Sequence, residues 1–569
     1  MKKRFTVTSA LPYANGPLHI GHLAGAYLPA DIFVRYQKNK GNDVAFICGS
    51  DEHGAAITLQ AKKNKTTPKK IIDKFHNLNK KTFSDFGIDF DFFHRTSEES
   101  HHKTAQDFFL KLNENNAFKI LTTKQYFDKQ ENQFLADRYI EGTCPKCGYE
   151  HAYGDQCENC GTALSPNELI NPKSKISGNS PVLRNTTHWF LDMQKHEKWL
   201  KEWINEGVIN EKKKHDSKDW KSQVISQCNS WIDNGLNERA MTRDLDWGVK
   251  LPIKNTDGKV LYVWLDAPIG YISSTKAWAK EKNKNWKDYW MNDETELIHF
   301  IGKDNIVFHC IIFPILLKIH GNYILPKNVP SNEFLNLEGR KISTSKNWAI
   351  WLHEFQKDFK NKQDSLRYYL CAISPEKKDS DFTWKDFQNR NNNELVDIYA
   401  NFINRVIVLT NKYYDGIIPK ISDLHSIDKD ILKEIEKSIE LVGYYIEKFE
   451  FKKSLMSFMN IARIGNKYLT DTEPWKLIKN DEKRVKTIMN ISIKVVAALS
   501  IISEPFFPFS SFQLREIIDI KNNYSWDFNI SKIINEGHKI GTPKHLFSRI
   551  NDAEIDKVIM KMEMKNEKK

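Results

Sequence analysis

The 569-residue sequence lacks the long hydrophobic runs of a membrane protein. One of its most apolar stretches, Ile311–Ile319, is interrupted by Pro314 and Lys318 and falls short of the ~20 residues that a spanning helix needs. The basic start Met1–Arg4 could open a signal peptide, but no apolar region of the required kind follows it. We therefore expect no membrane span and no membrane partner.

Cysteine is also too sparse for a disulfide scaffold, because the chain holds only eight, four of them in C-x-x-C pairs. This usage indicates a reducing cytosol, with thiolates used for metal. Hydrophobic residues at 40% exclude a disordered chain, and the length predicts three or more domains. The net charge of +12 suits a polyanionic partner, although the charges are mixed along the chain.

The first fifty residues have the pattern of a parallel α/β unit. Phe5–Thr8 and Val44–Cys48 are typical of buried strands, and the segment 18–37 between them is helix-like. In such units ligands lie at the carboxyl ends of the strands. Further strand candidates, Val260–Trp264 and Glu296–Gly302, predict that the same sheet continues later in the chain.

Two other regions do not have the alternating strand and helix pattern of the α/β unit. The segment 118–234 holds the cysteine pairs and several Gly/Pro turns, and we expect it to be an inserted module. The segment 391–550 consists of long helical patterns such as Glu394–Tyr413 and Lys429–Lys448, which predict an all-helical domain. The last residues, Asp556–Lys569, are expected to fray.

A pair of histidines stands where the first predicted strand turns into the first helix, in Pro17–His22. A helix start offers free N–H groups and partial positive charge, which favour phosphate. His19 and His22 lie three residues apart on one helix face and can both donate to a phosphate chain. Gly21 lets a flat base approach the backbone. An isolated pair of this kind is more often ordinary surface histidine, so a second motif is needed.

That second motif is the basic loop Leu337–Lys346, which contains Lys-Ile-Ser-Thr-Ser-Lys. Together the two motifs resemble the HIGH and KMSKS motifs of class I aminoacyl-tRNA synthetases. Two further segments, Ala10–Gly16 and Tyr262–Tyr271, are similar to those of methionyl-tRNA synthetases. The resemblance runs from about residue 5 to about residue 550.

The resemblance implies a Rossmann-like parallel-sheet catalytic domain, split by a zinc-knuckle insertion and followed by an all-helical anticodon-binding domain. The expected segments are the first catalytic half (1–117), the insertion (118–234), the second catalytic half (235–328), the KMSKS-loop and stem-contact region (329–390), the anticodon-binding domain (391–550) and a tail (551–569).

The implied reaction joins L-methionine to ATP as methionyl-adenylate, releasing pyrophosphate, and then transfers methionine to the 3′ end of tRNA(Met) for initiation and elongation. A carboxylate is ionised at pH 7, so the first step needs alignment and charge stabilisation and no general base. Mg²⁺ would accompany ATP. The catalytic residues would be His19, His22 and Lys341, and the ATP contacts His19, Gly21, His22, Asp304, Lys341 and Thr344.

Thr344 departs from the family pattern, because it replaces the usual second lysine of KMSKS. Either the loop makes fewer direct phosphate contacts, or Lys346 and Arg340 share that role.

The resemblance also implies a methionine pocket with apolar walls and an anion for the ammonium group. Sulfur packs well against aromatic edges and accepts weakly from a hydroxyl such as that of Tyr13. Asn305 stands where an apolar wall residue is expected. The implied methionine contacts are Leu11, Tyr13, Asp51, Trp264, Ala267, Pro268, Tyr271 and His309, with Asp51 facing the amino group.

The cysteine pairs are two C-x-x-C-G knuckles, Cys144–Gly148 and Cys157–Gly161. Four thiolates close a tetrahedral Zn²⁺ shell without an open position, so Cys144, Cys147, Cys157 and Cys160 predict one structural zinc. The insertion is too short for the editing domain of the isoleucine, leucine and valine enzymes. The remaining cysteines are expected to be core thiols, namely Cys48, Cys228, Cys310 and Cys371.

In the helical region, Asn401 and Arg405 lie four apart on one helix face, and Trp475 follows a proline turn. The resemblance implies that these three read the CAU anticodon, Trp475 by stacking on an unstacked base. We expect no appended OB-type RNA-binding domain, and we expect a monomer.

Two alternatives stay open at this point. The chain could be another class I synthetase, such as a cysteine or leucine enzyme, although the Tyr13/Trp264 pair argues against it. It could also be an inactive zinc-containing RNA-binding descendant of a synthetase, which the intact His19, His22 and Lys341 oppose.

Overall fold

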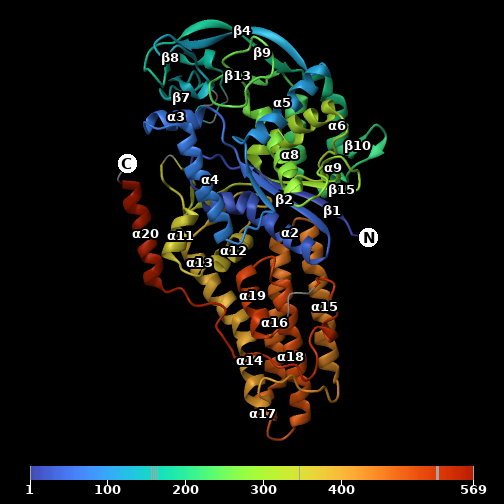
Figure 1. The fold of residues 1–569 in the computed structure, drawn as a ribbon. Helices are drawn as coiled ribbons and strands as arrows, with labels where there is room; N and C mark the ends of the chain where they lie inside the picture. The colour runs from blue at the N-terminus through green and yellow to red at the C-terminus, as the bar shows by residue number, and fades with distance from the viewer. Residues whose placement is uncertain are drawn as a thin grey trace.

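The computed structural model describes residues 2–154, 157, 159–160, 162, 164–344, 346–520 and 525–567. Gly161 and Ser345 of the motifs, and Lys568 and Lys569 of the tail, lie outside the described residues. The molecule is elongated, with a parallel sheet in the middle, the insertion at one end and a helical bundle at the other (Figure 1).

A parallel sheet of order β16-β15-β1-β2-β3 forms the centre of the molecule. The strand order reverses between β1 and β15, and ligands of such sheets bind in the crevice at this point, beyond the carboxyl ends of the strands. The predicted parallel strand–helix–strand unit is confirmed. The strands are β1 (Arg4–Ser9), β2 (Asp43–Ser50), β3 (Phe92–Arg95), β15 (Thr295–Gly302) and β16 (Ser331–Asn332).

Both faces of the sheet are covered, which explains why β2 is almost continuously apolar. Phe46 and Cys48 belong to the core on the α2 side, whereas Ala45 and Ile47 pack on the opposite side with α5, α8 and α10. The helical segments around the sheet are α1 (Ile20–His22), the π-helix η1 (Leu23–Tyr27), α2 (Leu28–Asn39), α3 (Ala55–Lys63), α4 (Pro68–Asp85), α5 (Glu99–Glu114), α8 (Val263–Glu281), α9 (Lys287–Trp290), the π-helix η7 (Phe308–Ile312) and α10 (Phe313–His320).

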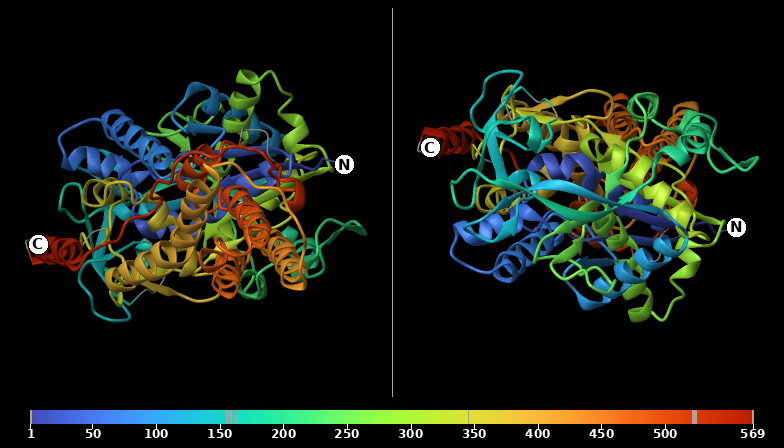
Figure 2. Two further views of the ribbon diagram at one scale, coloured as in Figure 1. Left: turned by 90° about the horizontal axis from the view of Figure 1, so that it is seen from below. Right: turned by 90° about the horizontal axis from the view of Figure 1, so that it is seen from above.

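The insertion between β3 and β15 is built on a long antiparallel ribbon of β4 and β9. Seen from above, this ribbon lies across the catalytic sheet and its helices (Figure 2, right). The elements of this region are β4 (Phe118–Asp128), β5 (Gln133–Phe134), β6 (Ile140–Thr143), β7 (Ala152–Tyr153), β8 (Ile170–Ser174), β9 (Val182–Leu191), α6 (Glu197–Glu206), β10 (Val208–Ile209), β11 (Lys212–Lys213), α7 (Ser222–Asp233), β12 (Arg239–Ala240), β13 (Thr242–Asp244) and β14 (Lys259–Leu261).

The strand predicted over Val260–Trp264 is wrong in extent and in place. Strand β14 ends at Leu261 and pairs antiparallel with β13, outside the parallel sheet. Tyr262 is the N-cap of helix α8, which begins at Val263. Aromatic and β-branched residues favour strands locally, but here they pack at a helix start, and tertiary contacts override that preference.

After the sheet come a small sheet and the helical bundle, and the predicted long helices of the bundle are confirmed. The elements are β17 (Leu335–Leu337), β18 (Arg340–Lys341), α11 (Leu352–Asp358), α12 (Gln363–Ala372), β19 (Ser380–Phe382), α13 (Trp384–Arg390), the π-helix η8 (Asn391–Ala400), α14 (Asn401–Tyr414), α15 (Ser426–Glu447), α16 (Phe451–Thr472), α17 (Pro474–Leu477), α18 (Glu482–Ile502), α19 (Pro508–Ile517) and α20 (Asp552–Glu567).

A buried ion pair joins the catalytic sheet region to the bundle. Arg367 on α12 donates to the Asp31 carboxylate on α2 at 2.6 Å and also to the carbonyl of Phe506, beyond α18. Both charged side chains are fully buried. Because breaking such a pair leaves an uncompensated buried charge, it fixes how the two domains sit against each other.

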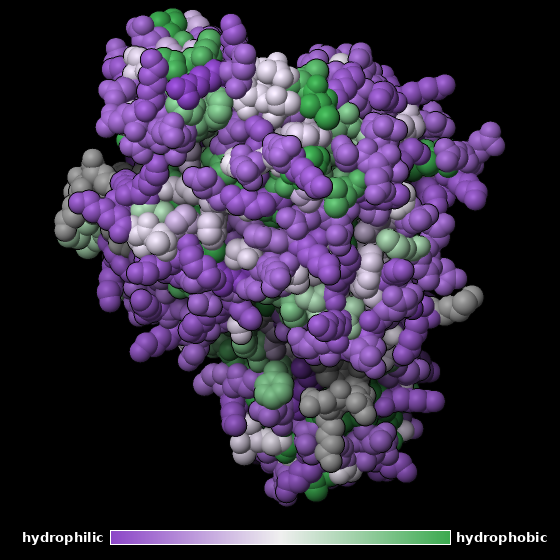
Figure 3. Space-filling view, turned by 45° about the horizontal axis from the view of Figure 1, so that its top comes forward, coloured by the Kyte–Doolittle hydropathy of each residue, from purple (hydrophilic) through white to green (hydrophobic). Residues whose placement is uncertain are grey.

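Helix α18 is a longer apolar segment than Ile311–Ile319. Its most apolar window has a mean hydropathy of 1.7, and 94% of that window is buried in the bundle. The expectation that the tail frays needs correction within the described residues, because Asp552–Glu567 forms α20, which packs against α13, and Lys561 pairs with Asp358 at 2.6 Å. The face of the molecule in Figure 3 is mainly hydrophilic, with small scattered apolar patches.

Candidate active site and metal centre

His19 and His22 lie together at the carboxyl edge of the sheet, just beyond β1. His19 caps α1, and its Nδ1 accepts from the Gly21 N–H at 3.1 Å. The His22 Nδ1 accepts from the His19 N–H at 3.1 Å, and the two rings stack at 3.7 Å between centroids. Since each Nδ1 accepts a hydrogen bond, each neutral ring carries its proton on Nε2. The pair is therefore a double N–H donor.

Burial keeps these imidazoles neutral at physiological pH. It lowers the pKa of His22 to about 4, and burial together with the neighbouring His22 lowers the pKa of His19 well below its usual range. Neutral rings can be preorganised donors toward phosphate oxygens without a change of protonation.

The HIGH-like and KMSKS-like segments are neighbours in the structure. Leu352 N–H donates to the Leu18 carbonyl at 3.0 Å, and Ile20 N–H donates to the Ile350 carbonyl at 3.1 Å. A Cβ on Gly21 would come within 3.3 Å of the Ile342 side chain. The basic loop thus lies against the start of the histidine-bearing helix, although more than 300 residues separate them in sequence.

The basic loop is shaped by two turns. Glu338 and Gly339, between β17 and β18, both have positive φ (48° and 71°), as a tight two-residue hairpin requires. Ser343 and Trp348 then exchange two backbone hydrogen bonds of 2.9 Å around the second turn. The exposed side chains of the loop include Arg340, Lys341, Thr344 and Lys346. The three cations among them, Arg340, Lys341 and Lys346, are therefore exposed to solvent.

A pocket lies at the same edge of the sheet, between the loops that follow β1, β2 and β15. Tyr13 and Asp51 extend the pairing of their strands, since Ala14 N–H donates to the Asp51 carbonyl at 2.8 Å and Asp51 N–H donates to the Pro12 carbonyl at 2.9 Å. The pocket is lined by Leu11, Tyr13, Asp51, Val263, Ala267, Pro268, Tyr271, Asn305, Phe308 and His309.

Seven of the eight methionine contacts expected from the sequence line this one pocket. The eighth, Trp264, lines a neighbouring pocket, and its ring meets Phe308 edge-on at 4.6 Å. Phe308 and Val263 also line this pocket, but the sequence did not identify them as wall residues. Asn305, Phe308 and His309 are spaced at three and four residues, and this helical spacing could have identified Phe308 as a wall residue.

One wall of the pocket is held by a hydrogen-bonded chain. The His309 Nδ1–H donates to the Asn305 carbonyl at 3.0 Å, so its Nε2 accepts from the Tyr271 hydroxyl at 2.9 Å. Burial lowers the pKa of His309 to about 4, in agreement with a neutral ring. Asn305 therefore supports the histidine through its backbone.

Asp51 is a buried carboxyl at the floor of this pocket. Burial and the negative charge of nearby Asp266 raise the pKa of Asp51 to about 8. Asp266 itself is buried, which would raise its pKa, but ion pairs with His53 (2.6 Å) and His101 (2.5 Å) lower it instead. The backbone N–H of His53 also donates to the Asp51 carboxylate, at 3.3 Å. This network was not predicted from the sequence.

Asp304 lies in the short 3₁₀ turn η6 (Lys303–Asn305), directly beyond the carboxyl end of β15. A Cβ on Gly302 would come within 2.7 Å of the Asp304 carboxylate oxygen. Glycine at 302 therefore leaves room for this exposed carboxylate beside the site.

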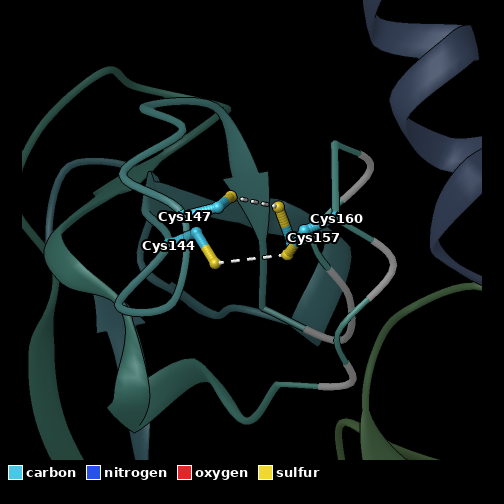
Figure 4. Close-up of side chains that lie close together, drawn as sticks. All are labelled: Cys144, Cys147, Cys157 and Cys160. Atoms are coloured by element: carbon cyan, nitrogen blue, oxygen red, sulfur yellow. Dashed lines mark hydrogen bonds between the residues drawn. The ribbon is translucent and has the colours of Figure 1, made fainter.

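The four cysteines of the insertion converge on one point (Figure 4). Their sulfur atoms all lie within 4.8 Å of one another, with Cys144 and Cys160 at 3.9 Å and Cys147 and Cys157 at 3.6 Å. A tetrahedron of Zn–S bonds near ~2.3 Å has sulfur–sulfur edges of about 3.8 Å. The residues present thus fit a closed four-thiolate metal site. The four single cysteines are all buried, as expected of core thiols.

Two of the three anticodon candidates are in contact at the far end of the bundle, near α17 (Figure 1). The Arg405 guanidinium lies 5.1 Å from the centre of the Trp475 ring, which is 36% exposed. Glu473 adopts φ 40° and ends α16, and Pro474 begins α17, so the tryptophan is held on a sharp turn. Asn401 is exposed one helical turn before Arg405.

The structure combines a parallel sheet, adjacent histidine and lysine motifs and an appended helical bundle. This combination defines a class I aminoacyl-tRNA synthetase. The family model described as "tRNA synthetases class I (M)" matches residues 5–407. The family model described as "Anticodon binding domain of methionyl tRNA ligase" matches residues 418–566. The chain belongs to the methionine–tRNA ligase family.

Curated relatives and solved structures agree with this assignment. The methionine–tRNA ligase of Christiangramia forsetii is 56% identical over 99% of this chain and 81% of the relative, and that of Cytophaga hutchinsonii is 54% identical over 98% and 81%. The crystal structure of Mycobacterium tuberculosis methionyl-tRNA synthetase bound by methionyl-adenylate has a TM-score of 0.78 at 19% identity, covering 96% of this chain and all of that one, and shows the shared fold.

Proposed function

We propose that this chain activates L-methionine with ATP to methionyl-adenylate and then charges tRNA(Met). The observation that carries the proposal is the neutral histidine pair lying against the basic loop, together with a pocket that contains a buried carboxyl at the carboxyl ends of the same sheet. Family membership at 56% identity supports the same activity.

In the first step, the methionine carboxylate attacks the α-phosphorus of ATP, and pyrophosphate leaves. His19 and His22 donate through Nε2–H to phosphate oxygens on one side of the nucleotide, and Lys341 approaches the departing phosphates from the other. Gly21 permits the close approach of the nucleotide, and Asp304 accepts from the ribose hydroxyls. Mg²⁺ bound with ATP would neutralise charge on the phosphates. These groups align two anions that repel each other in water.

Thr344 can offer only a hydroxyl where the family has a lysine. Lys346 and Arg340 are exposed on the same loop as Lys341, and we assign them the remaining contacts to pyrophosphate. The flexible stems of these side chains let a cation reach the phosphates without an exact backbone position.

The methionine side chain occupies the apolar part of the pocket, between Leu11, Ala267 and Pro268, with the sulfur near the hydroxyls of Tyr13 and Tyr271. Asp51 binds the ammonium group. Trp264 and His309 complete the enclosure, Trp264 through its edge contact with Phe308. A thioether suits this wall because sulfur is polarizable and packs well against aromatic rings.

In the second step, a ribose hydroxyl of the terminal adenosine attacks the carbonyl carbon of the adenylate. An ester bond forms, the acyl–phosphate bond breaks, and AMP leaves with the hydroxyl proton on its phosphate.

Methionine-dependent ATP–pyrophosphate exchange tests the proposal directly. The purified chain is assayed with each amino acid in turn, and we expect exchange with methionine above all others. Exchange with another amino acid would identify a different class I synthetase, and no exchange with any amino acid would support an inactive RNA-binding descendant.

Trp475, Arg405 and Asn401 form the proposed anticodon-reading surface. Replacing Trp475 with alanine removes a stacking platform that contributes about 1–3 kcal/mol per base, so kcat/KM for tRNA charging should fall about 5- to 150-fold. Exchange should stay near the wild-type rate, because the indole lies at the far end of the bundle. Tyr444→Ala, another exposed aromatic of this domain, is the control. Equal loss of charging and exchange would refute the anticodon role.

We assign the four-cysteine site to one structural Zn²⁺, which would tie the two knuckles of the insertion together. Mass spectrometry of the purified protein should find one zinc per chain, and Cys144→Ser should lower this content and make the insertion sensitive to protease. Cys228→Ser changes a buried cysteine outside the cluster and should retain the metal. Full zinc content in Cys144→Ser would contradict the assignment.

The proposal places the enzyme in the cytoplasm as a monomer. None of the eight cysteines, all of which lie in the described residues, forms a disulfide, which supports a reducing compartment.

A further inference from the structure

A buried aspartate behind the methionine pocket takes no part in the reaction as derived so far. Asp266 lies in the first turn of α8, directly before the pocket residues Ala267 and Pro268, but its own side chain is fully buried and does not line that pocket. Its two carboxylate oxygens contact different histidines, Nδ1 of His53 at 2.6 Å and Nε2 of His101 at 2.5 Å. A buried charge is costly unless it is paired, so these contacts are what keeps an ionised carboxylate at this position.

The histidine on α5 fixes one side of this carboxylate. The other ring nitrogen of His101, Nδ1, lies 2.8 Å from the hydroxyl of Ser273, two turns further along α8. That hydroxyl also contacts the Gly270 carbonyl at 3.1 Å, and the His101 side chain is fully buried. Asp266 is therefore held in one position by packed helices, and it is a fixed acceptor for His53.

His53 contacts two carboxylates with two different groups. Its ring binds Asp266, and its backbone N–H donates to the Asp51 carboxylate at 3.3 Å. His53 stands in the short loop between β2 and α3 and is followed by Gly54, whose φ of 104° is accessible mainly to glycine. Because the ring is anchored, the backbone of this loop is fixed, and the N–H group directs the Asp51 carboxylate.

The charges around this loop leave one carboxyl group for a ligand. Glu52 is fully buried and accepts from the Arg95 guanidinium at 2.9 Å, and Asp266 is paired with His53. None of the ion pairs formed within the described part of the chain involves Asp51. Asp51 is therefore the carboxyl group that remains for a cation in the pocket, such as the ammonium group of an amino acid.

Two neighbouring charges act on Asp51 in opposite directions. The negative charge of Asp266 adds to burial in raising the pKa of Asp51, whereas the positive charge of His53 lowers it, and Glu52 contributes a smaller rise. Burial would lower the pKa of His53, but Asp266 raises it, which favours the charged imidazole. The ionisation of Asp51 thus depends on both members of the Asp266–His53 pair.

The other titratable groups that face this loop are neutral. His102 on α5 has its ring 5.2 Å from that of His53, and burial with the charges of its neighbours lowers its pKa to about 4. Burial and the charge of Arg95 lower the pKa of His76, on α4, to about 3. The phenol of Tyr13, on the loop after β1, is uncharged at neutral pH. These groups therefore add no charge beside Asp51.

We infer that Asp266 is a positioning residue for methionine recognition: it anchors the His53 ring, and the His53 backbone in turn holds the Asp51 carboxylate toward the amino group of methionine. The inference rests on the proposed function, in which Asp51 binds that amino group. Asp266 itself touches no substrate.

The variant Asp266→Asn tests the inference, because it keeps the size of the side chain and removes the charge. The dissociation constant of methionine is measured by titration calorimetry as a function of pH, without ATP. Binding by the wild type should strengthen with pH through about 8, where Asp51 ionises. In Asp266→Asn the midpoint should fall by about one pH unit, because a like charge beside Asp51 is lost. Binding above the midpoint should weaken roughly 2- to 100-fold, because His53 loses its anchor.

The variant His53→Asn should shift the midpoint in the opposite direction. Asparagine can place an amide N–H near the position of Nδ1 and so keeps a donor for Asp266, but it removes the positive charge that favours ionised Asp51. The midpoint should therefore rise above that of the wild type. A general loss of packing would not produce opposite shifts. This variant also decides the question if Asp266→Asn does not fold.

The control is Asp428→Asn, which makes the same change at a fully buried aspartate that Arg484 holds in the bundle, and it should keep the wild-type midpoint. In Asp266→Asn, the KM for ATP in methionine-dependent exchange should stay near the wild-type value. An unchanged midpoint in either variant, shifts of both in the same direction, or equal losses for methionine and ATP would overturn the inference. If the expected midpoints are found but the wild type shows no methionine-dependent exchange, the inference stands and the proposed activation step is refuted.

Discussion

Replacing His22 with alanine should lower methionine-dependent ATP–pyrophosphate exchange about 10²- to 10³-fold. This is the size of effect seen when one preorganised donor to a developing charge is removed. His22 accepts the His19 N–H through Nδ1 and presents Nε2–H toward the phosphates, so alanine removes a donor and loosens its partner. Initial rates of exchange at saturating methionine and ATP measure the loss.

The fold should survive this change, because the His22 side chain is only half-buried and makes one hydrogen bond to the backbone. Thermal unfolding checks this, and a shift of only a few degrees is expected. His545→Ala, at an exposed position of the chain, is the matched control and should exchange like the wild type. Exchange by His22→Ala within about threefold of the wild type would mean that the phosphate site at this helix start is misassigned.

Replacing Asp51 with asparagine should lower kcat/KM for methionine by about 10²-fold or more and leave the KM for ATP nearly unchanged. Removing one partner of a buried charge pair costs roughly 2–5 kcal/mol. The amide keeps the shape of the side chain but cannot neutralise the ammonium group. Steady-state exchange kinetics with methionine and ATP varied separately distinguish the two effects. Asp293→Asn, at an exposed aspartate, is the control.

The same residue predicts a pH dependence. Because burial and Asp266 raise the pKa of Asp51 to about 8, its carboxyl is largely protonated in the free enzyme at neutral pH. The ionised form binds the ammonium, so kcat/KM for methionine should rise with pH through about 8 in the wild type. Asp51→Asn should lose this rise. A wild-type profile that is flat between pH 6.5 and 8.5 would contradict the raised pKa.

Local patterns were sufficient where the chemistry lies within a short segment. The cysteine knuckles could be interpreted from spacing alone, because two residues between thiolates set the geometry of a tetrahedral site, and the four sulfur atoms do converge. The buried strand β2 was also predicted, because Val44–Cys48 is apolar at successive positions, as a strand covered on both faces requires.

Predictions from local sequence patterns were wrong where residues distant in the chain decide the conformation. Val260–Trp264 has strand propensity, but Tyr262 caps a helix whose first turn packs against the sheet. The tail was expected to fray, but its described residues form α20, which contacts α13 and gains an ion pair with Asp358, far earlier in the chain.

The amino-acid sequence by itself determined the class of chemistry, because histidine, lysine and cysteine side chains carry their reactivity in any fold and their spacing identified the motifs. Only the tertiary structure decided how these groups act together. It stacks His22 on His19, brings the basic loop to the same helix start, and raises the pKa of Asp51. The physical reason is that burial and distance set electrostatic energies, and both depend on residues that the chain brings together only when folded.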